Sequence, residues 1–319
     1  MARRRTSSGD RFLYGIGEWY GRSFVRLTVQ ERRRYADLQS LPKRERPSQA
    51  CPFRSRPDVT DTCTKEGGVC SLRLYKRDGR TGRVSVAPDE EGDLCTTCPY
   101  RFYEDGLIFR WIGETILEHS TPRIVREVGF LERDTGTPLG EDDGAREDVG
   151  RIDHVLVRPN TATLSWCALE MQAVYFSGDS MQSEFRMLRE SENAGRGLPF
   201  PTGRRRPDYR SSGPKRLMPQ LQIKVPSLRR WGKRMCVVVD RAFFRALGTM
   251  DEAADVSNCD IAWFVVEYEE GDHDARLRRD SVHLTTLEHA VEGLTAGRTV
   301  TLETFEARIR AKLAGASPL

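Results

Sequence analysis

A chain of 319 residues, 38% hydrophobic and 31% charged, is long enough for one large domain or two ordinary ones with a genuine core. Its apolar runs, such as Ile261–Val266, are strand length, so no transmembrane helix is expected, and the opening MARRR lacks the apolar run of a secretory signal. These features exclude a membrane-spanning protein and predict a cytoplasmic one, in which eight cysteines favour metal binding or burial over disulfides.

The net charge is only +4, but bases and acids fall in separate blocks. Gly203–Arg234 holds eleven Lys or Arg and one acid, and residues 1–54 hold thirteen against five. Leu131–Gly150 holds seven acids against two bases, and Ala246–Asp274 holds nine acids and no Lys or Arg. Such segregation predicts one side that faces a polyanion and a back that does not. The alternative is a set of solvated faces with a basic tail.

The first third of the chain is predicted as two segments. Residues 1–46 are expected to form a basic helical segment, in which Thr28–Glu31 (TVQE) has the pattern of a helix-capping box. Residues 47–105 are rich in Pro, Gly and Cys and poor in apolar runs. That composition predicts a small module held together by something other than a hydrophobic core.

Residues 106–319 mix strands with helices and are expected to form one domain. Helices are predicted at Gly106–His119 and Arg241–Gly248, after Thr286, and from about Glu303. Strands are predicted at Ile124–Glu132, Arg151–Val157, Ala162–Gln172, Met235–Asp240 and from Ile261. The fold class is therefore α/β, with a mixed central sheet flanked by helices.

Five cysteines fall within the module, in the pattern Cys51-x(11)-Cys63-x(6)-Cys70-x(24)-Cys95-x(2)-Cys98. No histidine lies among them, so the pattern predicts a structural site of four thiolates with one cysteine to spare. Zinc is the default metal for such a site and iron is possible. The alternative is a set of free surface thiols. The other three cysteines lie in or beside predicted strands and are expected in the core: Cys167, Cys236 and Cys259.

An acid and an amide stand side by side in an otherwise apolar strand, at Glu170 and Gln172. A short turn joins this strand to the one that holds Asp153, so a hairpin would bring Asp153 close to Glu170. With the backbone carbonyl of Met171, the two carboxylates could hold magnesium through oxygen ligands and support phosphodiester hydrolysis. The alternative is two carboxylates on a wet sheet edge.

At this point the chain resembles the restriction endonuclease NotI family, part of the PD-(D/E)XK nuclease group. The resemblance runs in order through Ala50–Phe53, Asp61–Cys70, Cys98–Arg101, Leu169–Gln172 and Ala262–Glu267. It implies a PD-(D/E)XK core and a small module in which four cysteines hold iron: Cys51, Cys63, Cys70 and Cys98. Cys95 is then the spare. The catalytic residues of the family fall on Asp153, Glu170 and Gln172, with Gln where most of the group has Lys.

The sequence also departs from the family. Only 16 residues separate Asp153 from Glu170, which is tighter than expected, and Ser177–Arg216 aligns poorly. Because base-reading residues belong in such a segment, the recognition sequence does not carry over.

The basic block can now be interpreted as a DNA-binding segment, residues 203–234, in which Lys and Arg bind phosphates and Arg can also fork onto guanine. The candidate contacts are Arg204, Arg205, Arg206, Arg210, Lys215 and Arg216. The alternative is a disordered basic linker. The expected protein is a magnesium-dependent type II enzyme that cuts a GC-rich palindrome in double-stranded DNA as a homodimer, with a methyltransferase as a separate partner. Two alternatives remain: a DNA-binding protein that does not cut, and a repair or modification-dependent nuclease.

Overall fold

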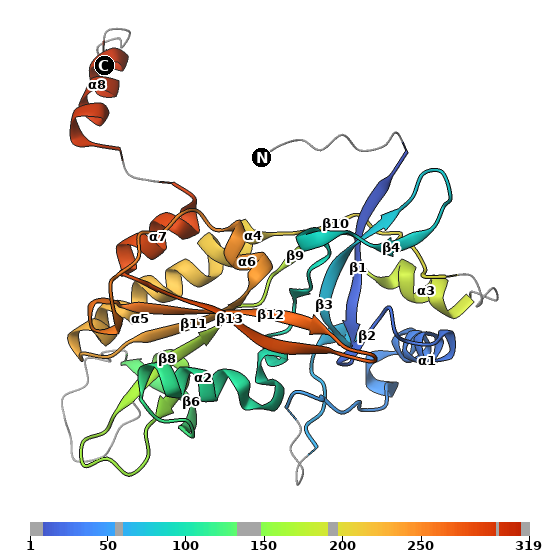
Figure 1. Ribbon diagram of the computed structural model, residues 1–319, viewed down its shortest axis with the longest axis horizontal. Coiled ribbons are helices and arrows are strands. Elements are labelled where there is room, and N and C mark those ends of the chain that lie inside the picture. The colour runs from blue at the N-terminus through green and yellow to red at the C-terminus, as the bar shows by residue number, and fades with distance from the viewer. Residues whose placement is uncertain (1–8, 55–59, 133–147, 191–196, 298–299, 314–319) are drawn as a thin grey trace.

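The computed structural model describes residues 9–54, 60–132, 148–190, 197–297 and 300–313. Two sheets dominate the fold (Figure 1). A six-stranded mixed sheet has the order β13-β12-β11-β8-β7-β6. A five-stranded antiparallel sheet has the order β2-β1-β3-β4, with β5 also paired to β3. The α/β class and the mixed sheet flanked by helices are confirmed.

The strands of the six-stranded sheet are β6 (Arg123–Glu132), β7 (Asp148–Val157), β8 (Trp166–Met171), β11 (Met235–Asp240), β12 (Ile261–Glu270) and β13 (Ala275–Thr285). Strand β11 pairs in parallel with β8 and β12, and the outer pairings are antiparallel. All six residues of β11 (MCVVVD) are buried, as expected of a central strand covered on both faces.

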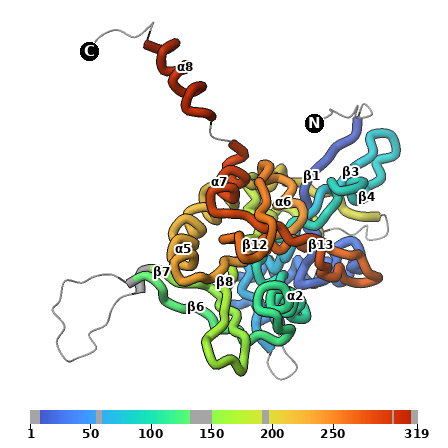
Figure 2. The backbone as a smooth tube through the Cα atoms, turned by 60° about the vertical axis from the view of Figure 1, so that its left-hand side comes forward, coloured from blue at the N-terminus to red at the C-terminus, as the bar shows by residue number. Residues whose placement is uncertain are grey.

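Helices cover both faces of this sheet (Figure 2). One face packs on α5 (Met218–Arg230) and α7 (Leu287–Thr295) through the side chains of Leu221, Val225 and Leu294. The other face packs on α2 (Leu107–Ile116) and on the preceding 3-10 turn η4 (Pro99–Gly106). Because side chains alternate along a strand, Leu169 and Met171 of β8 lie in the α2 core, while Ala168 lies in the α5 core.

The other elements are short or peripheral. A two-stranded sheet joins β9 (Phe176–Gly178) to β10 (Arg205–Pro207). Before α5 come α4 (Tyr209–Ser212) and a π turn, η5 (Gly213–Leu217). Helices α6 (Arg241–Ala246) and α8 (Leu302–Leu313) follow, and single 3-10 turns are η1 (Lys43–Glu45), η2 (Glu66–Gly68), η3 (Asp89–Gly92) and η6 (Val256–Asn258). No helix in these described ranges is long and apolar enough to cross a membrane.

The N-terminal sheet corrects two predictions. Its strands are β1 (Arg11–Trp19), β2 (Arg22–Ser23), β3 (Val69–Arg77), β4 (Val84–Val86) and β5 (Cys95–Thr96). The helical prediction for residues 1–46 is wrong at Arg11–Trp19, which is a strand paired with β3. It holds at α1 (Val29–Ser40), where Thr28 and Glu31 form the predicted capping box.

The second correction concerns residues 47–105, which were expected to lack a core. Their strand β3 lies in a cluster of buried side chains in which Leu72 and Tyr75 pack with Trp19 of β1. Helix α3 (Gln182–Glu190) closes this cluster, and Phe185 stacks on Trp19 with ring centroids 5.3 Å apart. The two predicted N-terminal segments therefore share one sheet and one core.

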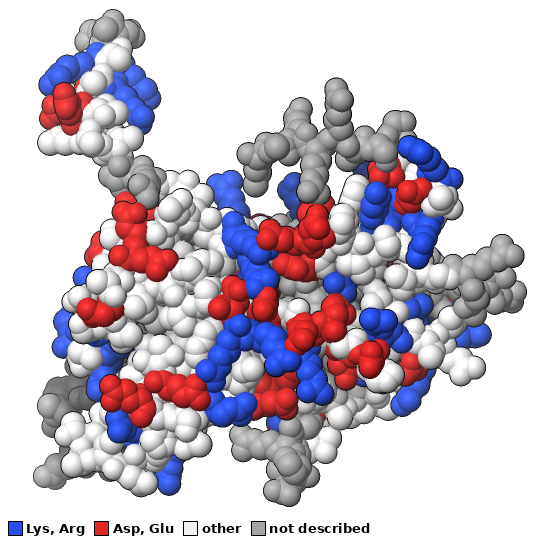
Figure 3. Space-filling model, viewed as in Figure 1, with Lys and Arg blue, Asp and Glu red and all other residues white. Residues whose placement is uncertain are grey.

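Charges segregated in the sequence are interleaved in space. The face in Figure 3 carries Lys and Arg among Asp and Glu across its whole width. The acidic block Ala246–Asp274 explains part of this mixture, because arginines from other elements pair with its acids. Arg73 binds Glu270 at 2.6 Å, and Arg22 lies 3.1 Å from Asp274. The acidic block is thus largely neutralised, while most of Leu131–Gly150 lies outside the described residues.

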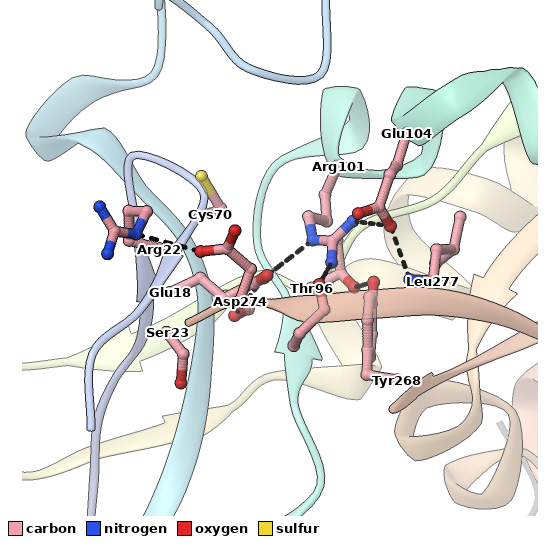
Figure 4. Close-up of polar contacts among 12 residues, drawn as sticks. Glu18, Arg22, Ser23, Cys70, Thr96, Arg101, Glu104, Tyr268, Asp274 and Leu277 are labelled. Atoms are coloured by element: carbon pink, nitrogen blue, oxygen red, sulfur yellow. Dashed lines mark hydrogen bonds and ion pairs between the residues drawn. The ribbon is translucent and has the colours of Figure 1, made fainter. Parts of the chain in front are cut away.

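One buried ion pair joins the two sheets (Figure 4). The guanidinium of Arg101, on η4, donates from Nε to both carboxylate oxygens of Glu18, on β1, at 2.9 Å. Its Nη1 donates to Glu104, and its Nη2 to the Ala275 carbonyl of β13 at 2.6 Å. Although burial opposes its charge, Glu18 holds the pKa of Arg101 above its ordinary value. Neither side chain of this pair is exposed at all.

Replacing Arg101 by Met should lower the free energy of unfolding by about 3–5 kcal/mol, because Glu18 would remain buried without its cation. Chemical and thermal unfolding followed by circular dichroism measure the change. The matched control is Arg310→Met, which removes an exposed pair with Glu306 and should leave stability nearly unchanged. Equal stability of both variants would show that the pair does not hold the sheets together.

Candidate active site

The β7–β8 hairpin brings the predicted carboxylates together. In its register His154 pairs with Leu169, so the next residue of each strand places Asp153 opposite Glu170. Both side chains line one cavity of about 840 Å³, together with Met171 and Gln172 at the end of β8. The structure therefore brings together the residues predicted for catalysis, and the wet-edge alternative is wrong for Glu170, which is 5% exposed.

Sequence reasoning missed a third charged group at this place. Lys224 reaches the carboxylates from α5, with its Nζ 2.8 Å from Glu170 Oε2 and 3.9 Å from Asp153 Oδ1. The same Nζ donates to Gln220 Oε1 at 3.0 Å. Its neighbours Leu221, Val225 and Leu228 are core residues, and they fix the face of α5 that meets the sheet.

The carboxylates carry more negative charge than the lysine neutralises. Burial raises the pKa of Glu170 to about 7, although Lys224 lowers it, and Asp153 raises it further. Above a pH of about 7, where Glu170 is ionised, two carboxylates share one ammonium and the site has a net negative charge. An additional cation would stabilise this arrangement.

The cavity has walls from both sheets. The side of the six-stranded sheet contributes the carboxylates with Arg216 and Gln220, and the N-terminal side contributes Gln39, Arg46 and Lys65. Gln172 lies at the rim of the sheet, where its backbone N–H donates to the Val238 carbonyl at 2.9 Å. A cavity with carboxylates at its base and cations along its walls suits a phosphodiester whose charge must be neutralised.

A family model decides what kind of protein this is. The model described as restriction endonuclease NotI matches residues 38–278, which is more than half of the chain. The chain belongs to the restriction endonuclease NotI family. A comparison with curated proteins gave no match. The family implies a hydrolase that binds double-stranded DNA and cuts it.

The basic residues predicted to meet DNA in this family member do not share one environment. Five of the six are exposed: Arg204, Arg206, Arg210, Lys215 and Arg216. Arg205 is buried, and its guanidinium forks onto both carboxylate oxygens of Glu184. Its remaining contacts are the carbonyls of Asp179, Ser180 and Tyr14. Arg205 therefore ties β10 to the N-terminal sheet, and the prediction that it contacts DNA is not supported.

Four of the five cysteines of the module lie near one another. The backbone N–H of Cys98 donates to the Cys70 carbonyl at 3.2 Å. Cys51 and Cys63 lie on adjacent chain segments, where the N–H of Cys51 donates to the Asp61 carbonyl and that of Cys63 to the Gln49 carbonyl, both at 2.7 Å. Burial raises the pKa of Cys98, and the Cys63 and Cys51 thiols add to that rise.

Cys95 lies elsewhere, among the residues of the α5 core, where burial and the carboxylate of Asp240 raise its pKa. The buried positions expected for Cys167, Cys236 and Cys259 are confirmed.

Four convergent thiols do not yet make a metal site. Among the described residues, no group of three or more His, Cys, Asp or Glu side chains is arranged to hold a metal ion. The predicted four-thiolate site is therefore not confirmed. At the Asp153–Glu170 site only two carboxylates and a backbone carbonyl are expected as ligands, so a group of three such side chains is not expected there.

Arg205→Met and Arg206→Met should separate the buried arginine from an exposed neighbour. Removing Arg205 leaves Glu184 buried without its cation and should cost about 3 kcal/mol or more of stability. Removing Arg206 should leave stability unchanged and, if it meets a phosphate, reduce the salt slope of DNA binding by about 0.9. Thermal unfolding and salt-dependent fluorescence anisotropy measure these effects. A stable Arg205→Met variant with weakened DNA binding would contradict this assignment.

Proposed function

We propose that this protein is a magnesium-dependent type II restriction endonuclease in which Asp153 and Glu170 form the catalytic site and Gln172 orients the water or a phosphate oxygen. The observation that carries the proposal is the pairing of the two carboxylates at the base of a cavity with cationic walls. Membership of the family supplies the reaction class, and the geometry supplies the residues.

The donor set fits magnesium. Hard oxygen ligands are those that magnesium prefers, and Asp153, Glu170 and the Met171 carbonyl would provide them. The net negative charge of the carboxylate pair, only partly neutralised by Lys224, favours a further cation at this place. When bound, magnesium would supply a Lewis acid for the phosphate and lower the pKa of a bound water.

The chain itself has three tasks in the hydrolysis. Asp153 and Glu170 would hold the magnesium ion at the phosphate, and Gln172 orients the water or a phosphate oxygen. The cations along the walls of the cavity neutralise the DNA backbone. One P–O bond forms from water while one P–O ester bond breaks. The proton that water loses balances the proton that the leaving oxygen gains. One strand end keeps the phosphate and the other becomes a hydroxyl.

The exposed cations of the basic segment support DNA contact along one side of the cavity. Arg216 lies over the Tyr175 ring, 4.7 Å from its centroid, and both residues line the cavity. We assign phosphate or base contacts to the exposed group alone: Arg204, Arg206, Arg210, Lys215 and Arg216. Arginine forks prefer guanine, so a GC-rich site follows from this composition together with the family resemblance.

A homodimer follows from the same proposal. An enzyme that cuts both strands of a palindrome needs two active sites related by the two-fold axis of the DNA. Each chain contributes one Asp153–Glu170 pair, and two chains complete the cut. A methyltransferase that protects the same sequence would be a separate protein. The second candidate function, DNA binding without cleavage, has the same cationic walls in its favour.

Asp153→Asn and Glu170→Gln should each reduce the cleavage rate by at least about 10³-fold, because either change removes a charged ligand and several kcal/mol of barrier lowering. Gln172→Ala should be milder, since an amide can orient but does not carry charge. The assay is incubation with varied DNA and magnesium followed by sequencing of the ends, with metal-free DNA binding measured in parallel.

Glu114→Gln, on α2 and paired with Arg279, is the matched carboxylate control and should cut normally. Normal rates for both catalytic variants would refute the residue assignment. Wild-type protein that binds DNA and leaves no ends would favour the non-cutting alternative. Ends that lack two-fold symmetry would rule out the homodimer on a palindrome.

We further propose that Cys51, Cys63, Cys70 and Cys98 hold one structural iron or zinc ion. Support comes from their convergence on chain segments joined by backbone hydrogen bonds and from the family resemblance. A consecutive pair of left-handed glycines, Gly67 and Gly68, turns the chain just before Cys70. Bound metal would cross-link the loops that carry the thiols.

Elemental analysis of purified protein should find about one iron or zinc per chain. Ser replacement of Cys51, Cys63, Cys70 or Cys98 should lose the metal and lower the melting temperature, because the metal links their loops. Cys95→Ser is the control that should keep it, since Cys95 lies in the α5 core. Native protein without a transition metal would refute the site, and loss of metal in Cys95→Ser would change its ligand set.

A further inference from the structure

The three catalytic candidates lack a cation for the phosphate. Asp153 and Glu170 are acids, and the amide of Gln172 can donate a hydrogen bond to a phosphate oxygen but carries no charge, so none of them brings a positive charge to the phosphate. Arg216 lines the cavity but lies at its exposed rim, over Tyr175. A phosphoryl-transfer site requires positive charge at the reacting atoms as well as metal ligands.

Lys224 is the described cation nearest to the carboxylates. Its Nζ lies 2.8 Å from Glu170 Oε2 and 3.0 Å from Gln220 Oε1, and both of those residues line the cavity. The ammonium is therefore hydrogen-bonded to two residues that line the cavity, and 8% of the Lys224 side chain is exposed. An ammonium has three N–H donors. Two are used by Glu170 and Gln220, and the distance of 3.9 Å from Nζ to Asp153 Oδ1 is too long for the third to form a hydrogen bond.

Lys224 lies on α5, and Arg216 lies on the π turn η5 that precedes this helix. Gln220 and Lys224 are four residues apart on α5, which places them on one face of the helix. Arg216 and Gln220 line the cavity, and Lys224 meets the carboxylates. Hydrophobic neighbours at Leu221 and Val225 are fixed in the core, so this polar face is held toward the site.

We propose that Lys224 is a catalytic residue of this enzyme, whose ammonium stabilises charge on a non-bridging oxygen of the scissile phosphate. This inference rests on the proposed nuclease function and adds a residue to it. The four-carbon stem lets the ammonium move from Glu170 to the phosphate once substrate is bound. Lys224 donates a hydrogen bond throughout and transfers no proton, so the balance of the hydrolysis is unchanged.

A purely structural role is the competing explanation, because a lysine beside a buried glutamate also neutralises it. The two roles differ in what they predict for a substrate in which sulfur replaces one non-bridging oxygen. Sulfur is a poor hydrogen-bond acceptor. A lysine that touches that oxygen loses its effect on the thio substrate, whereas a lysine that only supports the fold affects both substrates alike.

The experiment measures single-turnover cleavage with enzyme in saturating excess over DNA, on the oxygen substrate and on each thio diastereomer. Manganese is used so that sulfur–metal mismatch contributes little. Lys224→Met should cut the oxygen substrate at least about 100-fold more slowly than wild type, as expected for loss of one preorganised donor. Its metal-free DNA affinity should stay within about threefold. The rate penalty for one thio diastereomer should be clearly smaller in Lys224→Met than in wild type.

Two further variants guard against misfolding. Lys224→Arg keeps the charge beside Glu170 and should recover part of the rate that Lys224→Met loses. Lys312→Met removes an exposed lysine of α8 that does not line the cavity, and this variant should cut normally. Melting temperatures show which variants are folded.

A Lys224→Met variant that cuts at the wild-type rate would overturn this inference and leave the carboxylate site standing. An equal thio penalty in Lys224→Met and wild type would assign Lys224 a structural role. Wild-type protein that never cuts would overturn the nuclease function and this inference together.

Discussion

The position of the two cavity walls depends on one buried ion pair. The N-terminal sheet and the six-stranded sheet meet at Arg101 and Glu18, where the guanidinium also lies between the rings of Phe53 and Tyr268, at 4.4 and 4.8 Å from their centroids. Burying both charges costs several kcal/mol per ion, and only the dense set of hydrogen bonds around them offsets that cost. Because Nε donates to Glu18, Nη1 to Glu104 and Nη2 to the Ala275 carbonyl, the orientation of the guanidinium is fixed as well as its distance.

Three buried carboxylates, those of Glu18, Glu184 and Glu170, differ in how completely a cation pairs with their oxygens. Arg101 covers both oxygens of Glu18, and Arg205 covers both oxygens of Glu184. Each of these two carboxylates also accepts further hydrogen bonds, Glu18 from the Ser71 hydroxyl and Glu184 from the Gly203 N–H. Lys224 meets Glu170 through Oε2 alone, as a point charge. The third pair is thus the open one, and it is the one that faces the cavity beside Asp153.

The proximity of Asp153 and Glu170 was predictable from the sequence, because it depends only on neighbouring residues. Alternation along β8 and a short turn were enough to place Glu170 opposite Asp153. Lys224 was not predictable, because it lies 54 positions after Glu170 and an isolated lysine in a basic block gives no sign of burial. Arg205 was assigned to DNA for the same reason, since its partner Glu184 lies 21 positions earlier, on α3.

The N-terminal strand was missed because its partner is distant. Strand β1 pairs with β3 more than fifty residues away, and a glycine-rich run such as YGIG has little local strand preference. The separate acidic and basic blocks of the sequence predicted separate charged faces. In the fold, long-range ion pairs bring arginines beside the acids of one block, so the charges are mixed.

The closure of the N-terminal sheet against β13 bears on how the chain emerges during synthesis. Arg22 pairs with Asp274, the Ser23 N–H donates to the His273 carbonyl at 3.2 Å, and Arg101 bonds to Ala275. Two of these contacts join β2 to the turn before β13, where Ser23 and His273 are 250 positions apart, and the third joins η4 to β13. A ribosome adding about 5–20 residues each second therefore completes this closure only after a delay of roughly ten seconds or more. Until then the nascent chain carries the Asp153 and Glu170 carboxylates without the closed arrangement around them.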